Sequence, residues 1–222
     1  AKSSISYFSR AMKPDNGVYC TGGYIYRVHD GLYNKIMAAD DIKLPGTHNL
    51  ENYMAAFAAT DGYVDDDTCI SVAKSFSGVE HRLEQVRVLN GVTFINDSIG
   101  TSPTRTAAGL HALKQKPILI AGGYDKHIPF DELGDEICLH VKKLYLTGAT
   151  TEKIYDAVTK SKYFDGNLPI EKIDDFKDAV LAAADSAQDG DVVLLSPACA
   201  AFDKFKNFME RGKYFKQIVM EL

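Results

Sequence analysis

The sequence of 222 residues has no apolar run of the roughly 18 residues that a membrane-spanning helix needs, and it does not open with a basic segment followed by an apolar one. We therefore expect no membrane partner. Its four cysteines, Cys20, Cys69, Cys138 and Cys199, lie far apart and form no C-x-x-C pair. This spacing argues against a zinc knuckle and against a disulfide framework, so a reducing cytoplasm is the simplest setting.

An excess of positive charge is also missing. The 25 basic and 30 acidic residues give a net charge of -5, and no block of five or six like charges occurs. We therefore expect no nucleic-acid partner. Hydrophobic residues make up 45% of the chain, enough for one sizeable core or two modest ones. The chain begins at Ala1, without a methionine, and runs straight into a segment with the pattern of ordered structure, so we expect a fragment of a longer protein.

The first 45 residues have the pattern of β-structure. Strands over residues 24–28 and 32–38 flank Asp30 and Gly31, a dipeptide suited to the positive φ values of a tight hairpin turn.

The pattern then changes to helical. Pro45 and Gly46 interrupt the strands, Thr47 can cap a helix over residues 47–60, and a second helix is predicted over residues 66–76. We place the domain boundary at this change. The expected domains are residues 1–45, a remnant of a preceding domain, and residues 46–222.

From residue 78 onward strands alternate with helices. A hairpin turning at Asn90 and Gly91 comes first, and the alternation after it implies βαβ crossovers. The predicted fold class is α/β, a doubly wound, mostly parallel, dinucleotide-fold-like domain after a β-rich N-terminal part. The predicted strands cover 83–89, 92–97, 117–123, 143–148, 168–173 and 191–197, and the helices 103–114, 130–140, 151–161, 174–187 and 198–211.

Ligands of such sheets bind at the carboxyl ends of the strands. Asp97 follows a predicted strand directly, where a carboxylate is well placed to hold a ribose hydroxyl or a metal-bound water. The hydroxyl side chains that follow Asp97 could instead have a purely structural role, because Ser102 and Pro103 are typical of a helix start. The segments expected at this edge are residues 97–106, 122–127, 148–151 and 196–201.

Cationic and amide side chains near this edge suggest an anionic ligand. Arg82 in GVEHRLE suits a phosphate or carboxylate, although an ion pair with Glu84 is equally reasonable. His48 and Asn49 occupy a helix's first turn, where free N–H groups favour phosphate, although such residues are often surface residues. Neither G-x-x-x-x-G-K-[ST] nor G-x-G-x-x-G occurs.

Two further motifs come after predicted strands. In AGGYDKHIP the paired glycines allow backbone N–H groups to approach an anion, or form a simple turn, and Lys126 adds a positive charge. In SPACAAFDKFKNFMERGKYF we expect Ser196 and Pro197 to start a helix that Arg211 and Gly212 close, with its free N–H groups open to a substrate carboxylate. Its cysteine is interpreted as buried rather than nucleophilic.

In this order PGTHNLEN, GVEHRLE, NDSIGTSP, LIAGGYDK and LLSPACAAFDKFKNFMERGKYF resemble the successive motifs of the Mur ligase family, in particular of the members that join D-glutamate to UDP-N-acetylmuramoyl-L-alanine. The resemblance covers essentially the whole chain. It implies a cytoplasmic, three-domain enzyme of peptidoglycan synthesis, and we expect this enzyme to be a monomer. This chain would be the end of the central ATPase domain and the whole C-terminal domain.

The resemblance also implies the chemistry. ATP, with Mg²⁺, converts the L-alanyl carboxylate into an acyl phosphate, and the amine of D-glutamate then attacks it. The P-loop and most Mg²⁺ ligands of the family are missing from this sequence, so we expect the fragment to be inactive alone and to hold no metal by itself.

Site residues are implied by the same resemblance. Many members have lysine where this chain has Ile99, and serine where it has Ala201. The D-glutamate carboxylate must then be met by another cation, with Lys126, Arg105 and Lys204 as candidates, or more by hydroxyls and backbone N–H groups. The implied ATP-binding residues are His48, Asn49, Arg82 and Asp97, and the implied D-glutamate-binding residues are Ser98, Thr101, Lys126, Ala201, Phe202 and Phe208.

Two other functions stay open. One is a different amino-acid ligase, such as another Mur enzyme or a folylpolyglutamate synthase, which the S-P-A-C-A-x-F-D-x-F stretch disfavours. The other is a non-catalytic module of dinucleotide-like fold that binds a small molecule, which the missing ATPase motif would equally suit.

Overall fold

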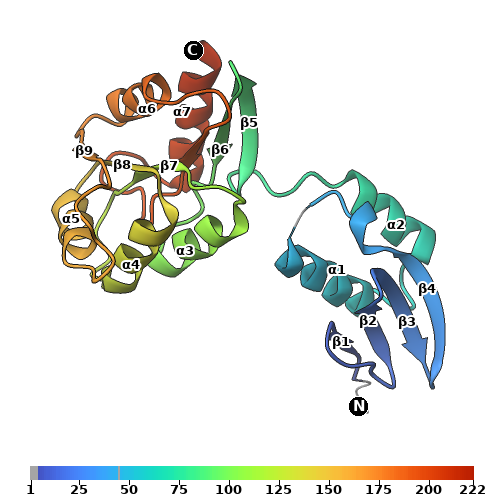
Figure 1. Cartoon of the computed structure of the whole chain (residues 1–222). Helices are drawn as coiled ribbons and strands as arrows, with labels where there is room; N and C mark the ends of the chain where they lie inside the picture. The colour runs from blue at the N-terminus through green and yellow to red at the C-terminus, as the bar shows by residue number, and fades with distance from the viewer. Residues whose placement is uncertain (1–4, 45) are drawn as a thin grey trace. The chain divides into compact units, whose positions relative to one another are not determined.

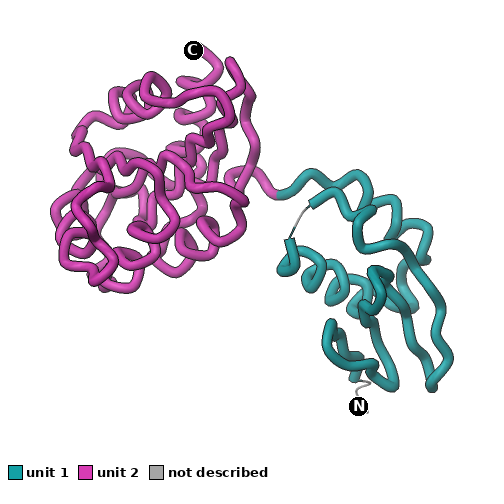
Figure 2. Tube along the Cα trace, in the orientation of Figure 1, with its two compact units in different colours: residues 1–78 teal, residues 79–222 magenta. Residues whose placement is uncertain are grey.

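The structure, a computed structural model, describes residues 5–44 and 46–222 (Figure 1). The chain forms two compact units, residues 1–78 and 79–222 (Figure 2). No helix in the described part of the chain has both the length and the apolar character needed to cross a membrane.

Unit 1 is built on a four-stranded sheet in the order β1-β2-β3-β4. The predicted hairpin is confirmed, because Asp30 and Gly31 have φ values of 47° and 78° and link two antiparallel strands. Only β1 and β2 run parallel. The strands are β1 (Tyr7–Ser9), β2 (Gly17–Thr21), β3 (Tyr24–His29) and β4 (Leu32–Ala38), and a short 3₁₀ turn, η1 (Ala39–Asp41), comes next.

Two helices, α1 (Thr47–Ala59) and α2 (Asp66–Ser75), complete unit 1. They share one core with the strands, in which Met54 and Phe57 of α1 are buried together with Ile25 of β3. Because this apolar surface would be exposed without the strands, the compact unit extends to Gly78. The boundary predicted between residues 45 and 46 therefore lies inside unit 1. The helix cap is Gly46 rather than Thr47, and Pro45 lies outside the described residues.

Unit 2 contains a six-stranded sheet in the order β5-β6-β10-β7-β8-β9. β5 is antiparallel to β6 through the predicted turn at Asn90 and Gly91, whose φ values are 50° and 78°, and all other pairs are parallel. The predicted doubly wound α/β fold is confirmed. The strands are β5 (Glu84–Leu89), β6 (Val92–Asn96), β7 (Ile118–Ala121), β8 (Lys143–Leu146), β9 (Ile170–Lys172) and β10 (Val192–Leu195).

Helices cover both faces of this sheet (Figure 1). Side chains alternate along β7, so Leu119 faces the core shared with α3, α4 and α5, while Ile118 and Ile120 face the core shared with α6 and α7. Each such fully buried side chain contributes about 1.5–3 kcal/mol of transfer free energy. The helices are α3 (Pro103–Ala112), α4 (Asp131–His140), α5 (Thr151–Thr159), α6 (Phe176–Asp185) and α7 (Phe208–Glu221).

The helix predicted over residues 198–211 is wrong. Residues 198–207 form a loop that starts with Ala198 at a φ of 60°, a left-handed conformation that a helix does not contain. The last helix begins ten residues later, where the side chain of Asn207 accepts a hydrogen bond from the backbone N–H of Glu210 at 2.9 Å. Arg211 and Gly212 therefore lie in the first turns of α7 instead of closing a helix.

Candidate functional site

Three loops meet at the carboxyl ends of β6, β7 and β10. The N–H of Asp97 donates to the carbonyl of Leu195 at 2.7 Å, and the N–H of Gly122 donates to the carbonyl of Pro197 at 2.8 Å. The hydroxyl of Thr150, after β8, accepts a hydrogen bond from the N–H of Gly123 at 3.1 Å. The sequence segments expected at this edge are thus brought together, and we call this region the carboxyl edge.

Asp97 is the buried carboxylate of the carboxyl edge, with 5% of its surface exposed. The hydroxyl of Ser196 donates to its Oδ2 at 2.7 Å and the N–H of Leu83 donates to its Oδ1 at 3.2 Å. Burial raises the pKa of Asp97 to about 6, although these hydrogen bonds and the charges of Arg82 and Arg105 act in the opposite direction. At neutral pH Asp97 is a desolvated anion held mainly by neutral donors.

Arg211 is the buried cation of the carboxyl edge, with 2% of its surface exposed. Its guanidinium donates to the hydroxyl and the carbonyl of Ser98 at 3.1 and 3.0 Å and to the carbonyls of Cys199 and Ala200 at 3.0 and 3.1 Å. Burial lowers the pKa of Arg211 to about 10, so it is charged at neutral pH. The side chain ties the loop after β6 to the loop after β10.

The GVEHRLE segment supplies a third buried polar side chain, His81, whose ring lies 6.0 Å from that of Phe208. Its Nδ1 is 2.9 Å from Nδ2 of Asn96, and burial lowers its pKa. Glu84 pairs with Lys216 at 2.6 Å, and Arg82 is exposed. The alternative interpretation, an ion pair between Arg82 and Glu84, is therefore not found.

Two of the predicted D-glutamate residues are buried. The hydroxyl of Ser98 donates to the carbonyl of Phe208 at 2.8 Å and accepts from Arg211, which leaves no exposed surface for a ligand. Ala201 is 2% exposed and lies in the loop, not at a helix N-terminus. Both residues therefore shape the carboxyl edge from beneath.

The other four reach the surface to different degrees. Thr101 and Phe208 are half-buried and Lys126 is exposed. Phe202 is 64% exposed, and its ring meets that of Tyr124 edge to face at 5.9 Å. Large aromatic side chains left in solvent at a strand edge are typical of a contact surface for a ligand or partner.

Of the three cations weighed for the substrate carboxylate, Lys204 is already engaged. Its Nζ donates to the carbonyl of Asp174 and pairs with the carboxylate of that residue at 3.0 Å. Arg105, in the first turn of α3, and Lys126, in the loop after β7, are exposed. Lys126 and Arg105 therefore stay as candidates.

The paired glycines do not offer their N–H groups to an anion, because those groups donate to Pro197 and Thr150. They permit close approach instead. A Cβ on Gly122 would lie 1.9 Å from the carbonyl oxygen of Thr147, and one on Gly123 would lie 2.5 Å from that of Ala200. The prediction of an anion-binding glycine turn is corrected to a packing requirement.

The segments of Thr106, Thr150 and Ser196 were expected at this edge, but their hydrogen bonds within this network, and the role of Arg211, were not predicted from the sequence. A signal for Arg211 was present: Asn207 followed three residues later by Glu210 is a helix-start pattern. It sets the start of α7 and turns Arg211 inward. Thr150 also contacts Cys199, the distance between Oγ1 and Sγ being 3.1 Å. Burial raises the pKa of Cys199 to about 11, as expected for a structural thiol.

His48 and Asn49 belong to unit 1. They lie in the first turn of α1, where His48 is exposed and Asn49 is half-buried. A Cβ on Gly46 would lie 2.9 Å from the ring of His48, so glycine is needed where the chain enters the helix.

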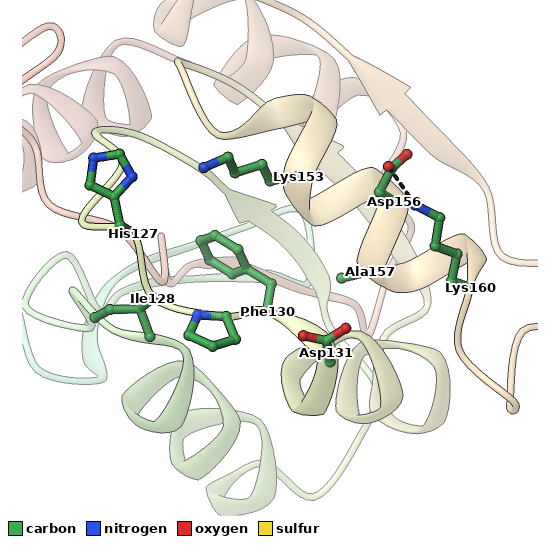
Figure 3. Close-up of a pocket in the computed structure, with 9 residues that line it drawn as sticks. His127, Ile128, Phe130, Asp131, Lys153, Asp156, Ala157 and Lys160 are labelled. Atoms are coloured by element: carbon green, nitrogen blue, oxygen red, sulfur yellow. Dashed lines mark hydrogen bonds and ion pairs between the residues drawn. The ribbon is translucent and has the colours of Figure 1, made fainter.

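A hollow of about 380 Å³ lies beside the loop after β7, between that loop, the start of α4 and α5 (Figure 3). The ring of Phe130 points into it, and Lys153 extends along its rim toward His127 (Figure 3). Lys160 pairs with Asp156 at 2.7 Å and Lys153 pairs with Asp125, so its cations are compensated. The predicted site residues are not among those that line it.

Comparison with known families identifies the class of this protein. Residues 81–199, more than half of the chain, match the family model described as Mur ligase, glutamate ligase domain. The chain belongs to the Mur ligase family, and the resemblance of its motifs is confirmed.

Curated relatives carry a more specific name. The chain is 47% identical over 223 residues to UDP-N-acetylmuramoylalanine--D-glutamate ligase of Clostridium novyi, and 48% identical over 222 residues to that of Acetivibrio thermocellus. These alignments cover 100% and 99% of this chain but 48% of each relative. The chain thus spans about half the length of the relatives it matches.

Solved structures of the same fold are more distant in sequence. A murein peptide ligase from Psychrobacter arcticus has a TM-score of 0.62 at 15% identity, covering 98% of this chain and 45% of that one. A bifunctional folylpolyglutamate synthase/dihydrofolate synthase from Yersinia pestis has a TM-score of 0.62 at 11% identity, covering 93% and 46%. These likenesses establish the fold alone.

Proposed function

We propose that this chain is the amino-acid-receiving part of a cytoplasmic, monomeric, ATP-dependent ligase that joins D-glutamate to UDP-N-acetylmuramoyl-L-alanine. The observation that carries the proposal is the identity of 47% and 48% with relatives named as D-glutamate ligases. In this proposal unit 2 is the C-terminal domain of the enzyme, and the strands of unit 1 end its central domain.

The nucleotide-binding proposal rests in unit 2 on Arg82 and Asp97. An exposed guanidinium fits a phosphate, and its charge acts on the buried carboxylate of Asp97, as the lowering effect on that pKa indicates. His48 and Asn49 are proposed to contact the nucleotide on the strength of motif resemblance alone. ATP supplies the phosphoryl group that turns the L-alanyl carboxylate into an acyl phosphate.

Mg²⁺ fits the carboxyl edge of unit 2 less well than the nucleotide does. Asp97 is 5% exposed, and each of its carboxylate oxygens accepts a hydrogen bond, from Leu83 and from Ser196, so little of the group is accessible to a hydrated Mg²⁺ ion. We therefore route no step through a metal at the carboxyl edge and assign Asp97 a hydrogen-bonding role.

The D-glutamate proposal rests on the exposed residues of the carboxyl edge. Lys126 is the proposed partner of a substrate carboxylate, Thr101 a hydroxyl donor, and the aromatic ring of Phe202 a wall that limits solvent. Ser98 and Ala201 support the pocket from within. Orienting the amine toward an activated carboxylate while excluding water is what these residues contribute.

The proposal is tested on the full-length gene product by following phosphate release. We expect ATP consumption only when UDP-N-acetylmuramoyl-L-alanine and D-glutamate are both present. Equal turnover with L-lysine or meso-diaminopimelate in place of D-glutamate would contradict the proposal. Replacing Asp97 by Ala is expected to reduce turnover strongly, and unchanged kinetics would remove it from the site.

A matched pair of lysines tests the substrate site separately. Lys126→Ala removes one charge-assisted hydrogen bond, so we expect the KM for D-glutamate to rise roughly tenfold to a hundredfold. Lys204→Ala serves as the control because that side chain is tied to Asp174, and its KM should stay within about twofold. Equal effects of the two variants would argue against Lys126.

A further inference from the structure

A second group of polar side chains lies on the pair of helices α3 and α4. His111 is in the last turn of α3, and Glu136 and His140 are one turn apart at the end of α4. Nε2 of His111 and Nε2 of His140 lie 2.8 and 3.4 Å from the same atom, Oε2 of Glu136. The ring centroids are 4.6 Å apart, and the three polar atoms all lie within 4.8 Å of one another.

The Glu136 oxygen lies at ion-pair distance from the two imidazole nitrogens but has no hydrogen bond from the described residues. Oε2 is buried and accepts no hydrogen bond from any described residue, because the two imidazole nitrogens approach it without hydrogen-bond direction. A carboxylate oxygen that has lost water and gained no donor is costly. A cation held between Oε2 and the two nitrogens would remove that cost.

The chemistry of the three ligands selects the cation. In a tetrahedral site with bonds of about 2.0–2.2 Å, ligand atoms lie roughly 3.4 Å apart. The two nitrogen–oxygen separations, 2.8 and 3.4 Å, are close to this value, and side-chain rotation would bring the two nitrogens, which lie within 4.8 Å of each other, to it as well. Two imidazoles with one carboxylate suit zinc-class transition metals, whereas Mg²⁺ and Ca²⁺ take oxygen ligands. Both helices also end here, and helix C-termini favour positive charge.

We propose that His111, Glu136 and His140 form a binding site for one Zn²⁺ ion, with a water in the fourth position. The site is independent of the proposed ligase reaction. Pro103 opens α3 at the carboxyl edge, and eight residues at 1.5 Å each put His111 about 12 Å farther along the helix. The ion therefore joins α3 to α4 at their far ends, and its expected effect is on the stability of unit 2.

Calorimetric titration of the metal-stripped 222-residue chain with ZnCl₂ tests the site. We expect one equivalent to bind, and His111→Ala and His140→Ala each to weaken binding roughly tenfold or more. His127→Ala is the matched control, because His127 is an exposed histidine of the same unit that lies outside this cluster and pairs with Asp125. Glu136→Gln keeps the shape of the site and should also weaken binding.

Spectroscopy and thermal unfolding distinguish metal-binding histidines from histidines that have only a structural role. Co²⁺ should give the visible absorption of a tetrahedral site, which His140→Ala abolishes, and Zn²⁺ should raise the Tm of the wild-type chain but not that of the double histidine variant. The histidine side chains are 54% and 38% exposed, so truncation leaves the core intact. Equal affinity in the variants and the control, or a pH-dependent ion pair without zinc binding, overturns the proposal.

Discussion

Each unit of this chain buries an arginine, and the two arginines are satisfied in different ways. In unit 1, Arg27 is 7% exposed and pairs with two carboxylates, Asp61 at 2.8 Å and Asp66 at 2.7 Å. In unit 2, Arg211 is 2% exposed, and its partners among the described residues are a hydroxyl and backbone carbonyls. The buried anion of that unit, Asp97, likewise has neutral donors.

The difference is between a buried charge that is paired with opposite charges, as in unit 1, and buried charges that are held by neutral groups, as in unit 2. Opposite charges in contact cancel each other's field, so Arg27 with its carboxylates holds β3 to the helices and has little effect at a distance. Charges that are satisfied by dipoles keep their field. Arg211 and Asp97, each held by neutral groups, are therefore buried charges without a paired counter-charge, which has a cost in stability.

The largest expected effect is the loss of Arg211. Arg211→Met keeps the apolar stem but leaves the carbonyls of Ser98 and Cys199 and the hydroxyl oxygen of Ser98 without the donor that Arg211 supplies. We expect unit 2 to lose roughly 3–5 kcal/mol of its free energy of unfolding. Urea unfolding followed by hydrogen exchange of the β7 and α7 amides measures it. Arg211→Lys should recover only part, because an ammonium cannot span the same acceptors.

Arg27→Met is the matched variant in unit 1. It removes the cation that Asp61 and Asp66 share. Asp61 keeps its contact with His29 and Asp66 its hydrogen bond from Asn34, and both carboxylates are partly exposed and can regain water, so we expect a loss of about 1–3 kcal/mol. Adding Asp66→Asn should reverse part of that loss. No such rescue by a carboxylate is available to Arg211. If the two methionine variants lose the same free energy, the distinction between paired and unpaired charge fails.

The next effect is the dependence of unit 2 stability on pH. The native pKa of Asp97 is raised from 3.8 to about 6, so between these values the folded state binds a proton that the unfolded state has released. Stability from this group is complete below the unfolded pKa and is lost as pH rises through the folded one. Above pH 6 the loss amounts to at most about 3 kcal/mol.

Asp97→Asn checks this sign. The variant removes the charge, so it should be more stable than the wild type at pH 8, with a difference that shrinks toward pH 4, as urea midpoints at both ends of the range would record. The Asn amide fits the Ser196 donor less well, so part of the gain is lost. Stability curves that run parallel in the two proteins would mean that the Asp97 pKa is not raised.

How much could be predicted from the sequence depended on whether the signal was local. The turns at Asp30-Gly31 and Asn90-Gly91 and the alternation of strands and helices were predicted, because φ preferences and periodicity are written in neighbouring residues. The last helix was misplaced, because the apolar residues between 202 and 209 have helical spacing. The left-handed Ala198 and the Asn207 cap outweigh that spacing.

For the candidate site, too, local features were predicted from the sequence and contacts between distant residues were not. Asp97 was predicted at the carboxyl edge because it directly follows a strand of a mostly parallel sheet. The burial of Ser98, the inward turn of Arg211 and the engagement of Lys204 by Asp174 were not, since each is a contact between residues far apart in the chain. Residue type could therefore indicate which side chains carry chemistry, but not which of them reach a ligand.

The smallest expected effect compares the helix caps that hold the two arginine environments. Asn207 caps α7, which carries Arg211, and Asp65 caps α2, whose first residue Asp66 pairs with Arg27. Replacing either residue by alanine should lower the free energy of unfolding of its unit by about 1 kcal/mol.

The two variants should differ in how far the disturbance spreads along the chain. Displacing the start of α7 also shifts the Arg211 donors, so Asn207→Ala should raise hydrogen exchange in the loop of residues 198–207, whereas Asp65→Ala should affect only the first turn of α2. Equal, purely local changes in both would mean that the Arg211 contacts do not depend on where α7 begins.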